Sequence, residues 1–117
     1  MNEFEEFKAV LDKLKPEHED KYWYEDTWKE AAKLFAADMN KTISFIRQCS
    51  DEEFGWMSEV FEDIAEATHS DSFVRAIKER ASFFHGERER NVLLEIGYAE
   101  GIINANKEKT NIERNDE

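Results

Sequence analysis

The length, composition and charge of this chain restrict its fold and its partners. Its 117 residues suffice for one domain with one core, and 40% of them are hydrophobic, including nine Phe. Acidic residues outnumber basic ones by 28 to 16, and the resulting net charge of −12 opposes binding to nucleic-acid phosphates or anionic lipids. With one Pro, four Gly and apolar residues at three- and four-residue steps, the sequence predicts an all-α fold.

The N-terminal part of the chain is predicted to form three helices. The first begins near Asn2 and ends before Pro16, which cannot continue a helix. Thr27 and Glu30 have the spacing of a capping box and are expected to open a helix over residues 27–39. Asn40 then marks a break before a short helix that ends near Cys49. The residues that these helices are expected to bury are Phe4, Phe7, Val10, Leu11, Leu14, Trp28, Ala31, Ala32, Phe35, Met39, Ile43, Phe45 and Ile46.

The remaining residues are predicted to form three longer helices. A second capping box, Ser50 to Glu53, opens a helix over 51–67, and polar residues 68–72 separate it from the next. That helix is expected to end at His85-Gly86, where Gly suits the left-handed conformation. The last helix spans 87–106, and residues 107–117 are predicted to form a frayed tail. The buried residues expected here are Phe73, Val74, Ile77, Ala81, Phe84, Val92, Leu93, Ile96, Ala99 and Ile103.

No interior linker, repeat or low-complexity segment divides the chain. Residues 1–117 are therefore predicted to form a single helical domain, a compact bundle of five to seven helices.

The residues that could carry catalysis or bind a metal are scattered. Glu66 and His69 have the Glu-x-x-His spacing of di-iron helix bundles, but a second such pair is absent and His69 lies at a predicted helix end. The sequence has no nucleophile elbow and no Gly-rich phosphate loop, and Cys49 has no neighbouring base. We therefore expect no catalytic residue, no metal and no cofactor.

Basic residues cluster around residues 75–90, but acids lie between them. Glu79, Glu87 and Glu89 interleave with Arg75, Lys78, Arg80, Arg88 and Arg90. This pattern predicts a solvated face with internal ion pairs rather than a nucleic-acid surface.

The predicted helix over 51–67 has the clearest division into two faces. At about 100° per residue, its apolar residues gather on one side and its acids form a stripe on the other. No Lys or Arg occurs between Arg47 and Arg75 to neutralise that stripe within the helix. Trp56 lies near the border of the two faces, where an aromatic can anchor an interface. The candidate partner-binding residues are therefore Glu52, Trp56, Glu59, Glu62, Asp63 and Glu66.

Two alternatives remain open at this point. The acidic stripe can be solvated, with Trp56 packed on a neighbouring helix. The three adjacent aromatics Tyr22, Trp23 and Tyr24 form a second candidate surface, which either exposes at least one ring or caps the core.

The sequence also favours a cytoplasmic location. The N-terminal segment Met1 to Glu6 carries acids where an export signal needs positive charge, and no uncharged run approaches the ~20 residues of a membrane span. The single Cys49 cannot form an intramolecular disulfide and is expected to be reduced and partly buried.

Three segments carry a resemblance to a known group of proteins. SDEEFGWMSEVFEDI (50–64), FVRAIKERA (73–81) and IGYAEG (96–101) resemble the small all-α immunity proteins of bacterial contact-dependent growth inhibition and polymorphic-toxin systems. The resemblance implies a cytoplasmic protein that binds and neutralises a cognate toxin domain by occluding its active site or substrate surface. Such toxins are often basic nucleases, so the acidic stripe is the expected contact. The alternative is a non-enzymatic acidic adaptor or regulatory protein, phage-derived or not, that binds a host factor.

Overall fold

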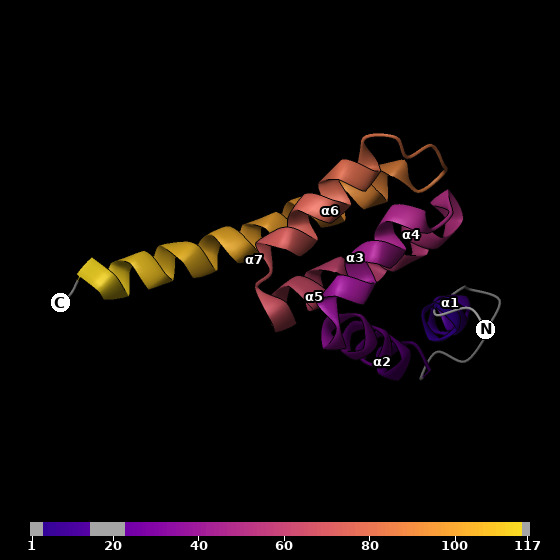
Figure 1. Cartoon of the computed structure of the whole chain (residues 1–117), viewed down its shortest axis with the longest axis horizontal. Helices are drawn as coiled ribbons and strands as arrows, with labels where there is room; N and C mark the ends of the chain where they lie inside the picture. The colour runs from indigo at the N-terminus through magenta and orange to yellow at the C-terminus, as the bar shows by residue number, and fades with distance from the viewer. Residues whose placement is uncertain (1–3, 15–22, 116–117) are drawn as a thin grey trace.

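The described chain consists almost entirely of helices. The computed structural model describes residues 4–14 and 23–115 (Figure 1). Within these residues the elements are α1 (Glu5–Lys13), α2 (Trp23–Ala37), α3 (Met39–Gln48), α4 (Asp51–Met57), the 3-10 turn η1 (Ser58–Val60), α5 (Phe61–Thr68), α6 (Asp71–Ala81) and α7 (Glu89–Asn115). The predicted all-α bundle of five to seven helices is confirmed.

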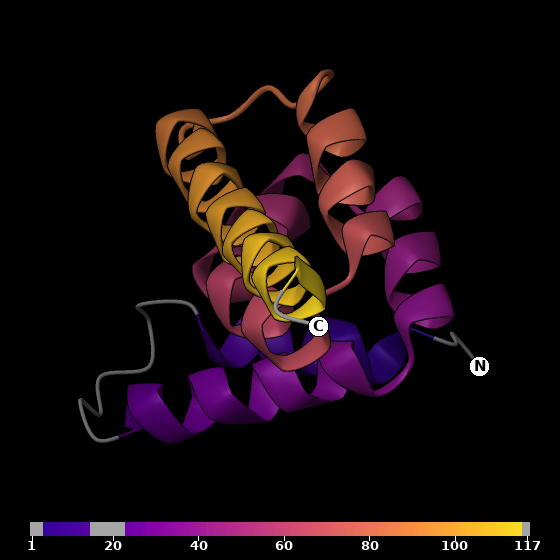
Figure 2. The same ribbon diagram turned by 90° about the vertical axis from the view of Figure 1, so that its left-hand side faces the viewer.

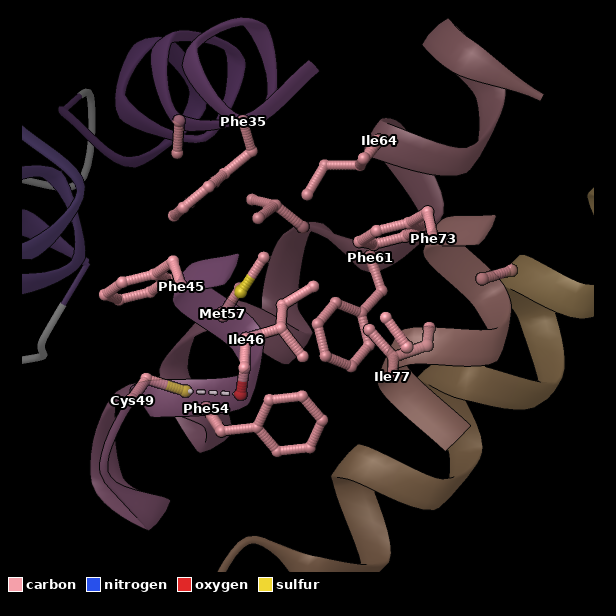
Figure 3. Close-up of a cluster of buried hydrophobic side chains, with 14 of the residues drawn as sticks. Phe35, Phe45, Ile46, Cys49, Phe54, Met57, Phe61, Ile64, Phe73 and Ile77 are labelled. Carbon is pink, nitrogen blue, oxygen red and sulfur yellow. Dashed lines mark hydrogen bonds between the residues drawn. The ribbon is translucent and has the colours of Figure 1, made fainter. Parts of the chain in front are cut away.

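The helices pack around a core that is rich in phenylalanine. Phe7, Phe35 and Phe45 bring α1, α2 and α3 together, with ring centroids 4.6 to 6.1 Å apart. Phe54, Phe61 and Phe73 do the same for α4, α5 and α6, at 5.3 and 5.9 Å (Figure 3). Edge and offset ring pairs add about 0.5 to 1.5 kcal/mol each beyond area burial. The two groups therefore stabilise the packing of α1 with α2 and α3, and of α4 with α5 and α6.

The helix α5 occupies the centre of the arrangement, and α7 covers it. α5 packs against both α7 and α2, and α6 packs against α3 and α7 (Figures 1 and 2). The molecule measures 52 × 33 × 31 Å, and the C-terminal half of α7 projects along the longest dimension. None of the described helices combines the length and the apolar character that a membrane crossing requires.

The predicted capping box at Ser50 is confirmed. Glu53 N–H donates to Ser50 Oγ at 3.0 Å, and Ser50 N–H donates to Glu53 Oε1 at 2.9 Å. Both bonds satisfy backbone donors that a helix start leaves without intrahelical partners, so they fix where α4 begins.

The predicted boundaries of the second helix are wrong. α2 already begins at Trp23, so Thr27 lies inside it and does not cap it. The break after α2 falls at Asp38, whose side chain accepts a hydrogen bond from Lys41 N–H at 3.2 Å and caps α3, whereas Asn40 lies within α3. Asp is as good an N-cap as Asn, and only the local backbone distinguishes the two positions. Trp28, predicted to be buried, is 38% exposed.

The helix predicted over 51–67 is interrupted. Ser58 Oγ donates to the Gly55 carbonyl at 2.5 Å and accepts from Asn91 Nδ2 at 3.0 Å. The backbone at Val60 departs from helical values, with φ −116° and ψ 8°. A hydroxyl that bonds a carbonyl of the preceding turn competes with regular helix geometry. The turn η1 therefore separates α4 from α5.

The predicted helix end at His85-Gly86 is also wrong. α6 ends at Ala81, and Gly86 does not have positive φ. A Cβ at Gly86 would lie 3.0 Å from Phe84 Cζ, so Gly gives the Phe84 ring room there and does not serve a left-handed turn. Among the described residues, positive φ is found at His69, at 48°, where it ends α5.

The last helix is longer than predicted. α7 begins at Glu89 and continues past residue 106 to Asn115. Residues 107–115 contain mainly helix-compatible residues and no Pro or Gly to stop the helix. Fraying of this end remains a prediction. Leu93, predicted to be buried, is 55% exposed.

Replacement of Ser50 tests the capping box. We expect Ser50→Ala to lower the free energy of unfolding by about 1 kcal/mol, because Glu53 N–H loses its acceptor, whereas Ser50→Asp retains an acceptor and most of the stability. Chemical denaturation followed by circular dichroism measures both. Equal losses in the two variants would contradict the capping role.

Candidate functional site

The structure divides the predicted acidic stripe into two groups. Glu62, Asp63 and Glu66 lie exposed on α5. Glu52 and Trp56 lie on α4, beyond η1, where they line a different hollow together with Arg88. The predicted residues therefore do not form one continuous surface, because η1 changes the helical phase between them.

Arg88 neutralises one of the predicted contacts and covers another. Its guanidinium forms an ion pair with Glu59 and lies 4.3 Å above the Trp56 ring. Asn91 Nδ2 also donates to Glu59 Oε1, at 3.2 Å. Glu59 therefore already has a basic partner, which comes from the loop before α7. Its contact with a cationic partner protein remains a prediction. Trp56 packs partly against the core, which is the alternative considered from the sequence.

The exposed acids of α5 gain a fourth carboxylate from α7. Partial burial raises the pKa of Glu95, and the negative charges of Glu62, Glu59 and Asp63 raise it further. Partial burial also raises the pKa of Asp63, with a further contribution from Glu66. We define the acidic face as Glu62, Asp63, Glu66 and Glu95. Within it, the charged forms of Asp63 and Glu95 are destabilised by partial burial and by neighbouring carboxylates.

The sequence did not identify Glu95 as a member of this surface. It stands alone between the apolar residues Leu94 and Ile96, and nothing in its neighbourhood indicates that α7 lies beside α5. One signal was available: Glu95 flanks the apolar stripe Val92, Ile96 and Ala99, so its carboxylate was bound to lie near the helix on which that stripe packs.

An apolar hollow adjoins the acidic face. It has a volume of about 660 Å³ and lies between α2 and α5. Asp63 is one of its walls, Lys29 and Lys33 form part of the other, and Trp28 stands at its edge. The remaining lining residues are the four alanines Ala32, Ala36, Ala37 and Ala67. Small side chains leave room for an inserted apolar group beside the carboxylates.

Lys78, Arg80 and Arg88 pair with acids of other elements, while Arg75, Lys78 and Arg90 are exposed. Arg80 is only 5% exposed; its Nη2 donates to the Cys49 carbonyl at 3.0 Å and to Asp51 Oδ1 at 2.7 Å. The guanidinium lies between the rings of Phe54 and Phe83, while its Nε and Nη1 lack hydrogen-bond partners. The expectation of solvation is wrong for Arg80. The ion pairs of Arg80 and Lys78 join them to Asp51 and Glu100 on other elements and not to the interleaved acids that the sequence suggested.

The remaining candidate groups do not assemble into a reactive site within the described residues. Burial raises the pKa of the Cys49 thiol from 9.0 to about 11, so it stays protonated and weakly nucleophilic at neutral pH. His69 ends α5, as predicted, and the described part of the chain brings together no group of three His, Cys, Asp or Glu side chains that would hold a metal. His18, Tyr22 and the side chains of Trp23 and Tyr24 lie outside the described residues.

Comparisons with protein-family models, with curated proteins and with solved structures find no match to this chain.

Removal of the Arg88 side chain tests its contacts. We expect Arg88→Ala to shift Trp56 emission to longer wavelength and to lower the free energy of unfolding by about 1 to 2 kcal/mol, because an ion pair and a cation–π contact are lost. The emission of Trp56 is obtained by subtracting the spectrum of Trp56→Phe, which lacks this ring. Arg75→Ala, which removes an exposed arginine elsewhere, is the matched control. Unchanged emission would contradict the stacking of Arg88 on Trp56.

The raised pKa of Glu95 predicts a pH-dependent effect on stability. A carboxyl whose folded pKa lies above its ordinary value of 4.5 favours folding when protonated, and this contribution is lost as the pH rises through the folded pKa. Glu95→Gln should therefore raise the melting temperature slightly at neutral pH and have no effect well below pH 4.5. The control Glu100→Gln, which removes the partner of Lys78, should not stabilise the protein at any pH.

Proposed function

We propose that this protein binds a cationic protein surface through the acidic face, and that it acts as an immunity protein of the bacterial cytoplasm. The partner would be the cognate toxin domain of a neighbouring gene, a basic nuclease, whose active site or substrate surface it occludes. The observation that supports this proposal is the convergence of Glu62, Asp63 and Glu95 on adjacent helices, where partial burial and the charges of Glu62, Glu59 and Asp63 raise the pKa of Glu95.

A basic partner would relieve the repulsion within the acidic face. Lys or Arg side chains placed among these carboxylates stabilise the charged forms that the isolated fold disfavours. The net charge of −12 adds long-range attraction, which mainly increases the association rate. Affinity is therefore expected to fall as salt concentration rises.

The apolar hollow supplies the second component that a tight interface needs. Charged rims contribute modestly unless a desolvated anchor lies beside them. The hollow lies directly beside Asp63, and its edge carries the half-exposed Trp28. An apolar side chain of the partner would enter between α2 and α5 while its basic neighbours contact the acidic face.

The reorganised site changes which of the original candidates we expect to matter most. Glu62, Asp63 and Glu66 remain, and Glu95 is added. Glu59 is already paired with Arg88, and Trp56 lies under the same guanidinium. Glu52 lies on the other side of η1 and is assigned a lesser role.

A growth assay tests the immunity function. This chain is co-expressed with the C-terminal domain of the large protein encoded immediately upstream. Rescue of growth by this chain, but not by an unrelated acidic protein, supports specific immunity. A toxic neighbour without rescue, or no toxic neighbour, would overturn it in favour of the alternative, an acidic adaptor or regulatory protein that binds a host factor.

Charge reversal then tests the choice of surface. We expect Asp63→Lys combined with Glu66→Lys to slow toxin association by roughly tenfold or more at low salt and to abolish rescue. The matched control is Glu79→Lys combined with Glu87→Lys, which makes the same change in net charge at exposed acids outside the acidic face. Equal loss in both pairs would show that net charge alone, not this face, governs binding.

A further inference from the structure

The outward side of α7 carries three exposed large apolar residues beside two exposed glycines. At steps of four, three, four, three and four residues, one line along the helix contains Arg90, Leu94, Gly97, Gly101, Asn104 and Glu108, all exposed. Leu93 and Tyr98 flank this line, at 55% and 49% exposure, and Leu94 within it is 52% exposed. Alternating steps of four and three keep residues on one side of a helix, so these six residues face the same way. We call this line and its two flanking residues the outer face.

The same helix buries its opposite side in the core. Val92, Ile96, Ala99 and Ile103 are each at most 7% exposed. Besides this buried stripe, α7 carries exposed apolar residues that the described part of the chain leaves uncovered. Three of the five exposed large hydrophobic residues in the described chain lie on the outer face. Such a grouping on one element marks an interaction surface.

The two glycines of the outer face are not explained by packing within the chain. A Cβ added at Gly97 or Gly101 would meet nothing within 4 Å, and neither residue has positive φ. Glycine inside a helix costs about 1 kcal/mol relative to alanine. Two glycines four residues apart on one side of a helix allow a second helix backbone to approach closely.

The charges at the two ends of the outer face are complementary to those of a second, antiparallel copy of the same face. The line of residues is symmetric about Ala99, with Arg90 at one end, Glu108 at the other and the two glycines in the middle. The ends are 18 residues, or about 27 Å, apart. When two copies of this face pack antiparallel, each Arg90 meets the Glu108 of the other copy. A parallel pair would instead bring like charges together.

We propose that the outer face binds a second copy of this chain in an antiparallel, two-fold symmetric dimer centred on Gly97 and Gly101. A two-fold interface uses the same patch on both copies, which the symmetric sequence order of the outer face satisfies. The C-terminal half of α7, which projects from the body, then lies along the N-terminal half of its counterpart (Figure 1). This dimer is independent of the acidic face and of the proposed function.

Sedimentation equilibrium of the full chain, across the micromolar concentration range, measures the dimer directly. We expect the mass to rise from one chain to two with concentration. Gly101→Leu should raise the dissociation constant at least about tenfold by blocking backbone approach. The control Glu79→Leu adds the same side chain at an exposed position of α6 and should leave the dissociation constant unchanged. A single-chain mass at all concentrations, or a dimer insensitive to Gly101→Leu, would overturn the proposal.

Charge exchange tests the antiparallel arrangement. Arg90→Glu and Glu108→Arg should each weaken self-association by about tenfold, since each homodimer places like charges together at both ends. Mixed in equal amounts, the two variants should recover the wild-type association, because both ends of the mixed dimer then pair Glu with Arg. No recovery on mixing would overturn the antiparallel dimer.

Alanine at the glycine positions separates folding from association. Gly97→Ala combined with Gly101→Ala should raise the melting temperature of the dilute monomer, because alanine favours the helix, and should weaken the dimer at the same time. Circular dichroism and sedimentation measure the two effects. Association that strengthens together with the melting temperature would show that the glycines do not serve helix contact.

Discussion

The burial of α5 between α2 and α7 is the constraint on which the rest of the structure depends. Phe61, Ile64 and Ala65 are fully buried, so this short helix fixes the positions of its two longer neighbours. A helix of eight residues has only about two turns, and its remaining positions must face solvent at the edges. Glu62, Asp63 and Glu66 occupy those edges. The acidic face and the apolar hollow are both consequences of this packing.

The same packing decides which acids remain charged and accessible. Where the chain brings a basic group to an acid, as with Arg88 and Glu59 or Arg80 and Asp51, the pair holds elements together. Where it brings another acid, as with Glu95, the carboxylates repel and the fold is less stable. A surface that reduces stability without an internal role is typical of binding sites, which supports the proposed function.

The sequence predicted the elements of this fold better than its surfaces. The periodicity of apolar residues identified nearly all of the core, and the Ser50 capping box was visible because its two partners are three residues apart. The interruption at η1 was not predictable, since it depends on Ser58 contacting Asn91 from a distant helix. The roles of Arg88 and Glu95 were not predictable for the same reason, since they too depend on contacts between segments that are distant in sequence. Local patterns determine helices, whereas neutralisation and clustering of charge depend on which helices become neighbours.

The buried Arg80 has a consequence for how the protein opens. Its guanidinium joins the start of α4 to the end of α6 across 29 residues of sequence. Separation of these ends would leave a positive charge among the rings of Phe54 and Phe83 without its carboxylate, which is strongly unfavourable. The two segments are therefore expected to exchange their amide hydrogens as one cooperative unit. The Arg80 side chain thus couples the opening of two helix ends that are far apart in sequence.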